Sequence, residues 1–318
     1  MTDRDERDAT ESWPELPYAH WKDTCTTLHL WLQVVGKIRL ALTPWINHSW
    51  HATFYLTARG LTTSPIPYGR RSFEMTFDFV DQVLRIDSGV DSRRVALRPQ
   101  SVARFHEAVF LALAELGIAV SIHALPNEVP DPIRLDRDRL HATYDPEYAW
   151  RFFRVLAQAD RVFKQFRTGF LGKCSPVHLF WGSLDLAVTR FSGRGAPLHP
   201  GGVPALPDTV AREAYSHEVS SAGFWPGGAG LDDAAFYSYA YPAPAGFREA
   251  KVKPAGAHFD ANLGEFILPY AVLRAARDPD GDLLDFLTST YEAAANAAGW
   301  DRGALECSLG RPGVPRSL

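Results

Sequence analysis

Segments typical of helices and segments typical of strands are grouped along this chain rather than alternating one by one. Residues 18–42 carry apolar side chains at helical spacing, and residues 50–98 then show the aromatic, β-branched and alternating patterns of strands. The same order of helix, strands and helix recurs over residues 146–298. A parallel sheet would place a helix between most successive strands, so grouped strands favour antiparallel pairing. We therefore predict an α+β fold, with mainly antiparallel sheet and long helices packed on it.

Two helix starts are predicted from capping residues. Ser101 stands before an apolar pattern of helical period that continues through Leu116, where Gly117 provides a stop. Asp145 is followed by Pro146, which is the preferred order of an N-cap and the first helical position, and this helix is expected to end near residue 168.

The repeated order of elements predicts an internal duplication with a pseudo-twofold axis. At one constant offset, identical residues align in four places: Val35 with Val162, Lys37 with Lys164, His51 with His178, and Thr62 with Thr189. Four matches are few, so the prediction depends on the order of elements and not on these identities.

An aperiodic segment, residues 125–145, separates the two halves. It contains three prolines and a run of mixed charges, which are typical of a connection and not of a helix or strand. We expect one compact unit with the following parts: a disordered tail over 1–12, an N-terminal α+β half over 13–124, a linker over 125–145, a C-terminal α+β half over 146–300, and a tail over 301–318.

Charge, cysteine count and hydropathy limit the partners and the compartment. The net charge of −4 argues against a nucleic-acid binder that uses a basic face, and the apolar runs are too short for a transmembrane helix. Three cysteines do not describe a disulfide framework and suit a reducing compartment, and the charged N-terminus is not a secretory signal. We therefore expect a cytoplasmic protein with a small-molecule ligand and with neither nucleic acid nor membrane as partner. The sequence does not determine the oligomeric state.

Titratable and aromatic residues are concentrated in two stretches, residues 173–194 and 213–228. Such concentrations are typical of sites where the pKa values of side chains are tuned. The candidates for catalysis are His178, His217, Glu218 and Asp185. The candidates for substrate contacts are Arg190 and Arg194 as anion clamps, Trp181, Trp225, and Lys37. Lys37 belongs to a polar stripe with His29 and Gln33 on the first helix, for which a solvent-facing position is the alternative.

A divalent metal is a further hypothesis. Its candidate ligands are His178, His217, Glu218 and His51. No HExxH motif, CxxC pair or His-x-His motif supports them, and histidines hydrogen-bonded in the core or at the surface are the alternative.

We predict that His178, His217 and Glu218 meet around one cavity, with Arg190 or Arg194 at its edge. The two strands that carry them flank one loop and could be neighbours in a sheet. Adjacent residues of a strand point to opposite faces, so His217 and Glu218 can share a site only at a bulge or a strand end.

Four motifs resemble those of an uncharacterised bacterial family that is known only as a domain of unknown function. They are HLWLQVVGKIRLAL, TARGLTTSPIPYG, GKCSPVHLFWGSLDLAVTRFSGR and EAYSHEVSSAGFWPGG. The resemblance extends from about Trp13 to Trp300. It implies a single full-length unit and brings no activity, cofactor or catalytic residue.

Three classes of function remain. The favoured hypothesis is an enzyme that acts on a small polar or anionic molecule through a His/Glu/Arg pocket, with or without a metal. The alternative is a non-catalytic binding module with an aromatic-lined pocket, for which the candidate residues are Trp181, Trp225, Tyr237 and Tyr239. The third class is a structural or partner-binding protein. If His178 and Glu218 lie on opposite sides of the sheet, more than about two strand spacings apart, the shared site is refuted and the binding module becomes the better hypothesis.

Overall fold

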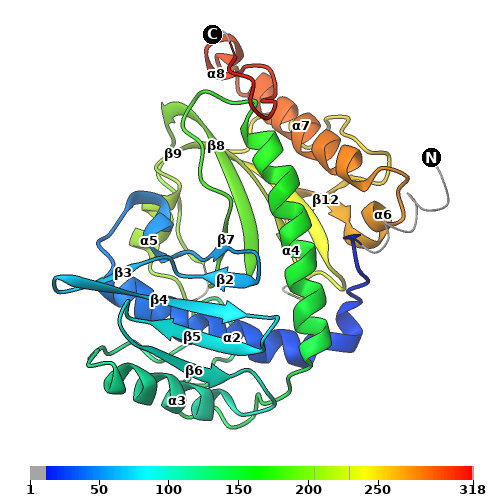
Figure 1. Ribbon diagram of the computed structural model, residues 1–318. Helices are drawn as coiled ribbons and strands as arrows, with labels where there is room; N and C mark the ends of the chain where they lie inside the picture. Colours follow the sequence, from blue (N-terminus) through cyan, green and yellow to red (C-terminus); the bar gives the residue numbers. More distant parts are fainter. Residues whose placement is uncertain (1–11, 204, 229, 317–318) are drawn as a thin grey trace.

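The computed structural model describes residues 12–203, 205–228 and 230–316. These residues form two six-stranded sheets in which all pairs are antiparallel, together with long helices (Figure 1). This arrangement confirms the predicted α+β class. No helix in the described ranges is both long enough and apolar enough to span a membrane.

The N-terminal sheet has the strand order β1-β2-β4-β5-β6, and β3 pairs with β4. Its strands are β1 (Tyr55–Leu56), β2 (Gly60–Thr62), β3 (Ile66–Tyr68), β4 (Arg71–Asp78), β5 (Val83–Asp87) and β6 (Ser92–Ala96). The C-terminal sheet has the order β11-β12-β10-β9-β8-β7. Its strands are β7 (His178–Phe180), β8 (Asp185–Gly195), β9 (His217–Trp225), β10 (Ala235–Tyr241), β11 (His258–Asp260) and β12 (Glu265–Pro269).

The long helices begin at the expected places. Ser101 accepts a hydrogen bond from the backbone N–H of Arg104, and Asp145 accepts one from that of Glu147, as N-caps do. The helices are α2 (Tyr18–Leu42), the 3-10 helix η1 (Asn47–Ala52), α3 (Val102–Glu115), α4 (Pro146–Arg167), α5 (Asp208–Ala214), α6 (Tyr270–Arg274), α7 (Pro279–Ala297) and α8 (Arg302–Leu305).

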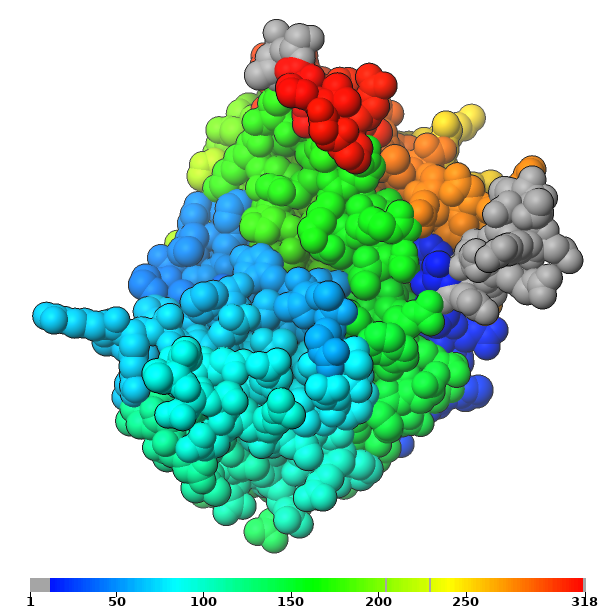
Figure 2. Space-filling view, in the orientation of Figure 1, coloured from blue at the N-terminus to red at the C-terminus, as the bar shows by residue number. Residues whose placement is uncertain are grey.

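One hydrophobic core contains buried residues of both halves. Helix α4 runs along the C-terminal sheet and reaches α2, where the rings of Phe152 and Trp21 lie 5.2 Å apart (Figure 1). In the space-filling view, the N-terminal half and the first part of the C-terminal half adjoin over a wide boundary (Figure 2). The halves therefore do not have separate cores.

The two sheets have related topologies. Without β3 and β11, each is an antiparallel meander that follows a long helix and precedes another helix. The sheets also meet, because Phe54 and Leu179 form an antiparallel bridge in which each backbone N–H donates to the other residue's carbonyl, at 2.9 and 2.8 Å. A twofold relation between the halves would produce such a pair. The internal duplication itself stays a prediction.

The segments expected to connect or end the fold are partly packed. Residues 125–145 contain no helix or strand, but Leu135, Asp138 and Tyr144 are buried. The expected tail over 301–318 includes α8, and the N–H of Leu171 donates to the carbonyl of Leu305 at 2.7 Å. The expected tail over 1–12 lies outside the described residues except for its last residue.

Candidate functional site

The two faces of the C-terminal sheet differ in chemistry. One face packs against α4 and α7, and it carries apolar residues such as Val188, Phe224, Phe236 and Leu268. The other face, which we call the polar face, carries residues that the strand register places together: His178, Asp185, Thr189, Ser221, Tyr237, Tyr239 and Glu265. Polar side chains on a largely buried sheet face need partners, so the polar face is the candidate functional site.

Asp185 lies at the base of the polar face and is 5% exposed. Tyr237 donates its hydroxyl hydrogen to one oxygen of Asp185, and Ser183 donates to the other at 2.5 Å. The ring of Tyr237 reaches Asp185 by crossing Gly223, where any Cβ would overlap the ring. Trp225 covers the Tyr237 ring with a centroid distance of 4.4 Å.

Two further carboxyl groups lie near Asp185. Glu128 rests against Gly182, where a Cβ would collide with its carboxylate, and Glu265 stands at the start of β12. Burial raises the pKa of Glu128 to about 7 and that of Glu265 to about 8, and the charge of Asp185 adds to both shifts. Burial also raises the pKa of Asp185, and this effect exceeds the opposite effect of the hydrogen bonds from Ser183 and Tyr237, which lower it. No described residue forms an ion pair with any of the three carboxyl groups.

Tyrosines complete this group. The hydroxyl groups of Tyr215 and Tyr239 are hydrogen-bonded at 3.0 Å, and the rings of Tyr237 and Tyr239 are stacked with centroids 6.1 Å apart. Burial raises the pKa of Tyr215 to about 12 and keeps all three hydroxyl groups protonated. The carboxyl–tyrosine cluster is defined here as Glu128, Asp185, Glu265, Tyr215, Tyr237 and Tyr239.

The polar stripe of α2 supports this cluster and does not face solvent. His29 Nε2 lies 2.9 Å from the carbonyl oxygens of Trp181 and Gly182, in the turn before Asp185. Gln33 donates to the carbonyl of Asn127 at 2.7 Å and accepts from its backbone N–H at 2.8 Å.

Lys37 belongs to the same stripe. Its Nζ donates to the side-chain oxygen of Asn127 and lies 5.4 Å from the centroid of the Trp181 ring. Burial lowers the pKa of Lys37 to about 8. Lys37 and Trp181, both predicted substrate contacts, are therefore neighbours beside the loop that carries Glu128.

His178 and Glu218 lie on opposite faces of the C-terminal sheet. His178 is paired with Ala187 and, through it, aligned with Gly223, which puts its side chain on the polar face. Glu218 is an odd number of positions from Gly223 in β9 and points to the other face. His217 shares the polar face but pairs with Gly195, at the far end of β9. The structure therefore does not bring the predicted triad together.

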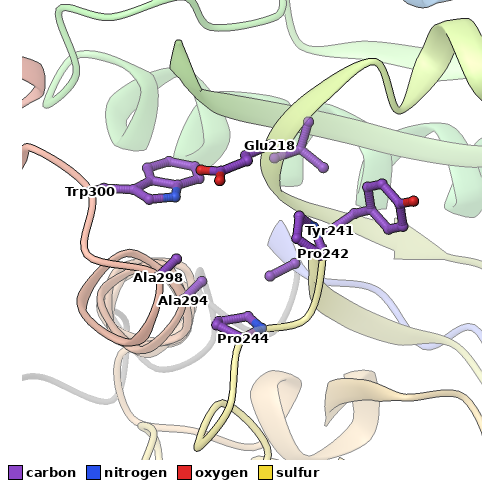
Figure 3. Close-up of a pocket in the computed structure, with 9 residues that line it drawn as sticks. Glu218, Tyr241, Pro242, Pro244, Ala294, Ala298 and Trp300 are labelled. Carbon is purple, nitrogen blue, oxygen red and sulfur yellow. The ribbon is translucent and has the colours of Figure 1, made fainter. Parts of the chain in front are cut away.

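Glu218 lines a pocket of about 170 Å³ at the end of α7 (Figure 3). The other labelled residues of its wall are Tyr241, Pro242, Pro244, Ala294, Ala298 and Trp300. Arg194 donates to Glu218 at 2.7 and 2.9 Å and to the carbonyls of Ala298 and Gly299 at 2.8 and 3.2 Å. These contacts connect the C-terminal end of α7 to the sheet. Arg194 and Glu218, both predicted site residues, therefore have a structural role here.

Arg190, predicted to clamp an anion, lies on the apolar face and is 4% exposed. Its guanidinium carbon is 3.5 Å from the ring centroid of Phe166, 4.4 Å from Tyr291 and 5.0 Å from Phe170. One nitrogen donates to the carbonyl of Phe166 at 2.5 Å. Three rings surround the cation, and the sheet itself separates it from the polar face.

The predicted metal ligands are not grouped. His217 Nδ1 is hydrogen-bonded to the hydroxyl group of Ser216. His51 Nδ1 accepts a hydrogen bond from the backbone N–H of Ile46 at 3.1 Å. Within the part of the chain that the structure describes, no three His, Cys, Asp or Glu residues are arranged to hold a metal ion.

Sequence reasoning missed two carboxyl groups of the cluster, Glu128 and Glu265, and it also missed Arg39, a buried charged residue of α2. Glu265 is the first residue of β12, and successive residues of a strand point to opposite faces. The sequence pattern could therefore have predicted that Glu265 and Ile267 lie on the same face. Arg39 stands in a helix that is apolar on most sides, which is a signal for a buried charge. Glu128 lies in an aperiodic segment and had no such signal.

A model of one protein family, described as a family of unknown function, matches residues 13–307, as the resemblance of the four motifs predicts. No curated protein and no solved structure matches the chain.

Proposed function

The chain belongs to the family DUF5996, whose function is unknown, and we propose that it binds a small organic cation at the carboxyl–tyrosine cluster. One observation carries this proposal. Glu128, Asp185 and Glu265 share one region without an ion pair to any described lysine or arginine. A ligand that brings a positive charge would provide the missing partner.

The pKa values of the carboxyl groups support a cationic ligand. Their negative charges repel one another, and burial adds to the cost of ionising them. A positive charge within about 4–6 Å favours the ionised form and lowers a carboxyl pKa. Binding of a cation and release of protons are therefore linked at this cluster.

Aromatic rings favour an organic ammonium group over a compact, strongly hydrated ion. Trp225, Tyr237 and Tyr239 present their rings in one layer on the polar face. The negative face of such rings attracts cations, and desolvated cation–π contacts contribute about 2 kcal/mol. Glu128, Glu265, Tyr239 and Trp225 are partly exposed, and the buried Oε2 atom of Glu265 has no hydrogen-bond partner among the described residues.

The binding hypothesis is better supported than the enzyme hypothesis. The acid–base groups named for an enzyme, His178 and Glu218, lie on opposite faces of the sheet. The aromatic residues named for a binding module include Tyr237, which donates a hydrogen bond to Asp185, and Trp225 and Tyr239, which pack against the Tyr237 ring. Acid–base chemistry on the bound cation is a second candidate function, favoured by Glu128, because a pKa of about 7 suits proton transfer at neutral pH.

Titration calorimetry of the full chain with benzylammonium chloride and with neutral benzyl alcohol tests this proposal. We expect one site that prefers the cation, and Asp185→Asn should weaken binding by about tenfold or more, equivalent to about 1.4 kcal/mol. Asp91→Asn removes an exposed carboxylate in the turn after β5 and serves as the matched control. Equal binding of benzyl alcohol, or an unchanged affinity in Asp185→Asn, would refute the proposal.

A further inference from the structure

Arg39 is a buried cation whose donors are not satisfied. It lies in the last turn of α2, is 7% exposed, and its guanidinium carbon is 5.4 Å from the ring centroid of Tyr55. Its Nε and Nη1 atoms are buried and have no hydrogen-bond partner among the described residues. The Arg39 side chain has a hydrogen bond with Tyr55, but that bond leaves Nε and Nη1 without an acceptor. Burying charged donors in this way costs several kcal/mol, so these two atoms need an acceptor that the described residues do not supply.

Two buried histidines beside Arg39 also have unused nitrogens. Within the described ranges, neither ring nitrogen of His178 has a hydrogen-bond partner, and the same is true of His51 Nε2. Both residues are almost completely buried. His178 packs against Tyr55 with ring centroids 6.2 Å apart, so Arg39 and His178 flank the same ring. Burial is the main cause that lowers the pKa values of His51 and His178. The positive charge of Arg39 lowers both pKa values further.

Two further cations stand around this group. Arg167, at the end of α4, also acts electrostatically on His178. Lys173 Nζ lies 5.3 Å from the centroid of the Trp50 ring, and the ring of His178 lies 6.4 Å from Trp50 on centroids. Among the described residues, none of Arg39, Arg167 and Lys173 forms an ion pair.

We propose that Arg39, His178 and His51 form a binding site for a phosphate group, with Arg167 and Lys173 at its rim. An arginine fork matches the oxygens of phosphate, and imidazole N–H groups donate to the same oxygens. The three cations favour a doubly charged phosphate over a singly charged carboxylate. This site uses none of the residues of the carboxyl–tyrosine cluster, so either proposal can fail without the other.

Titration of the full chain with inorganic phosphate, followed by calorimetry and by NMR of the histidine rings, tests the site. We expect one phosphate per chain and a shift of the His178 ring signals. Arg39→Met should abolish binding, and Arg167→Gln and Lys173→Gln should each weaken it about threefold or more. Arg70→Gln removes the same charge in the turn between β3 and β4, which projects from the surface (Figure 2), and should leave binding unchanged.

Several results would overturn this proposal. They are an absence of phosphate binding in the wild-type chain, binding of acetate as tight as that of phosphate, and equal effects of Arg70→Gln and Arg167→Gln. If Arg39→Met does not fold, the rim variants decide, because the side chains of Arg167 and Lys173 are both exposed and their replacement should not disturb the core. A crystal structure from phosphate buffer with only water at Arg39 would also count against it.

Discussion

The indole ring of Trp181 lies directly against the backbone of Gly36, in the C-terminal half of α2. A Cβ at position 36 would overlap three atoms of the indole ring. Glycine inside a helix costs about 1 kcal/mol relative to alanine, so the close packing of Trp181 has to outweigh this cost. The contact holds the turn before β8, and with it Asp185, against α2.

Gly36→Ala should therefore destabilise the protein, although alanine is the better helix former. We expect a loss of about 1–3 kcal/mol in the free energy of unfolding, because the indole must move to admit the methyl group. Urea denaturation measures this loss. Gly195→Ala is the control, since an added Cβ there meets nothing within 4 Å. A Gly36→Ala protein that is as stable as the wild type would show that Trp181 has room to move.

Tyr237→Phe should lower stability by about 1–3 kcal/mol, because the buried carboxylate of Asp185 loses a hydrogen-bond donor. The same change should raise the pKa of Asp185, since the lost hydrogen bond favours the ionised form. Tyr241→Phe is the control, because that hydroxyl donates to an exposed carbonyl, that of Pro197. Thermal and urea unfolding of both variants compare the two losses, and equal losses would contradict the prediction.

Glu265 should make stability depend on pH. Its pKa is raised from 4.5 to about 8 by burial, so the folded protein holds a proton that the unfolded chain releases. The stability that it contributes is fully present below pH 4.5 and is lost as the pH rises to about 8.

Glu265→Gln has no charge to lose, so it should be more stable than the wild type at pH 8 by about 1–3 kcal/mol and should gain little at pH 4.5. Denaturation at the two pH values measures the difference. Glu107→Gln, on the exposed side of α3, provides the comparison. A gain of the same size at both pH values would rule out the linkage to Glu265.

Arg190→Lys should reduce stability by about 1–3 kcal/mol without changing the affinity for benzylammonium or phosphate. A flexible ammonium group cannot stack against Phe166, Phe170 and Tyr291 as the planar guanidinium does. Unfolding experiments and calorimetry on the same variant separate the two effects. A change in affinity with unchanged stability would restore the predicted role of Arg190 as an anion clamp.

The helices could be predicted from the sequence because their signals are local. Asp145 and Pro146 mark the start of α4, and Ser101 marks that of α3, through contacts within the first turn. The pairing of strands depends on residues far apart in the sequence. Nothing local indicates that His178 aligns with Gly223, because a long connection containing α5 separates β8 from β9 and does not set their register.

The candidate site was predictable only in part for the same reason. Asp185, Trp225 and Tyr237 were singled out, yet their contacts arise from the register of three strands and the absence of a side chain at Gly223. The stripe of His29, Gln33 and Lys37 was visible as a pattern. Its burial follows from the packing of a loop more than eighty positions away, which no helical periodicity describes.

The hydrogen bonds between Phe54 and Leu179 also explain how this chain protects its sheets from aggregation. A strand at the edge of a sheet offers unpaired N–H and C=O groups to any other chain, and this exposure promotes intermolecular association. Here β1 and β7, each at one end of its sheet, come together at this pair, so each sheet covers an edge of the other. Either half produced alone would expose that edge, and antiparallel pairing with an identical copy would satisfy it. The contact between the halves thus has the geometry of a dimer interface enclosed within one polypeptide.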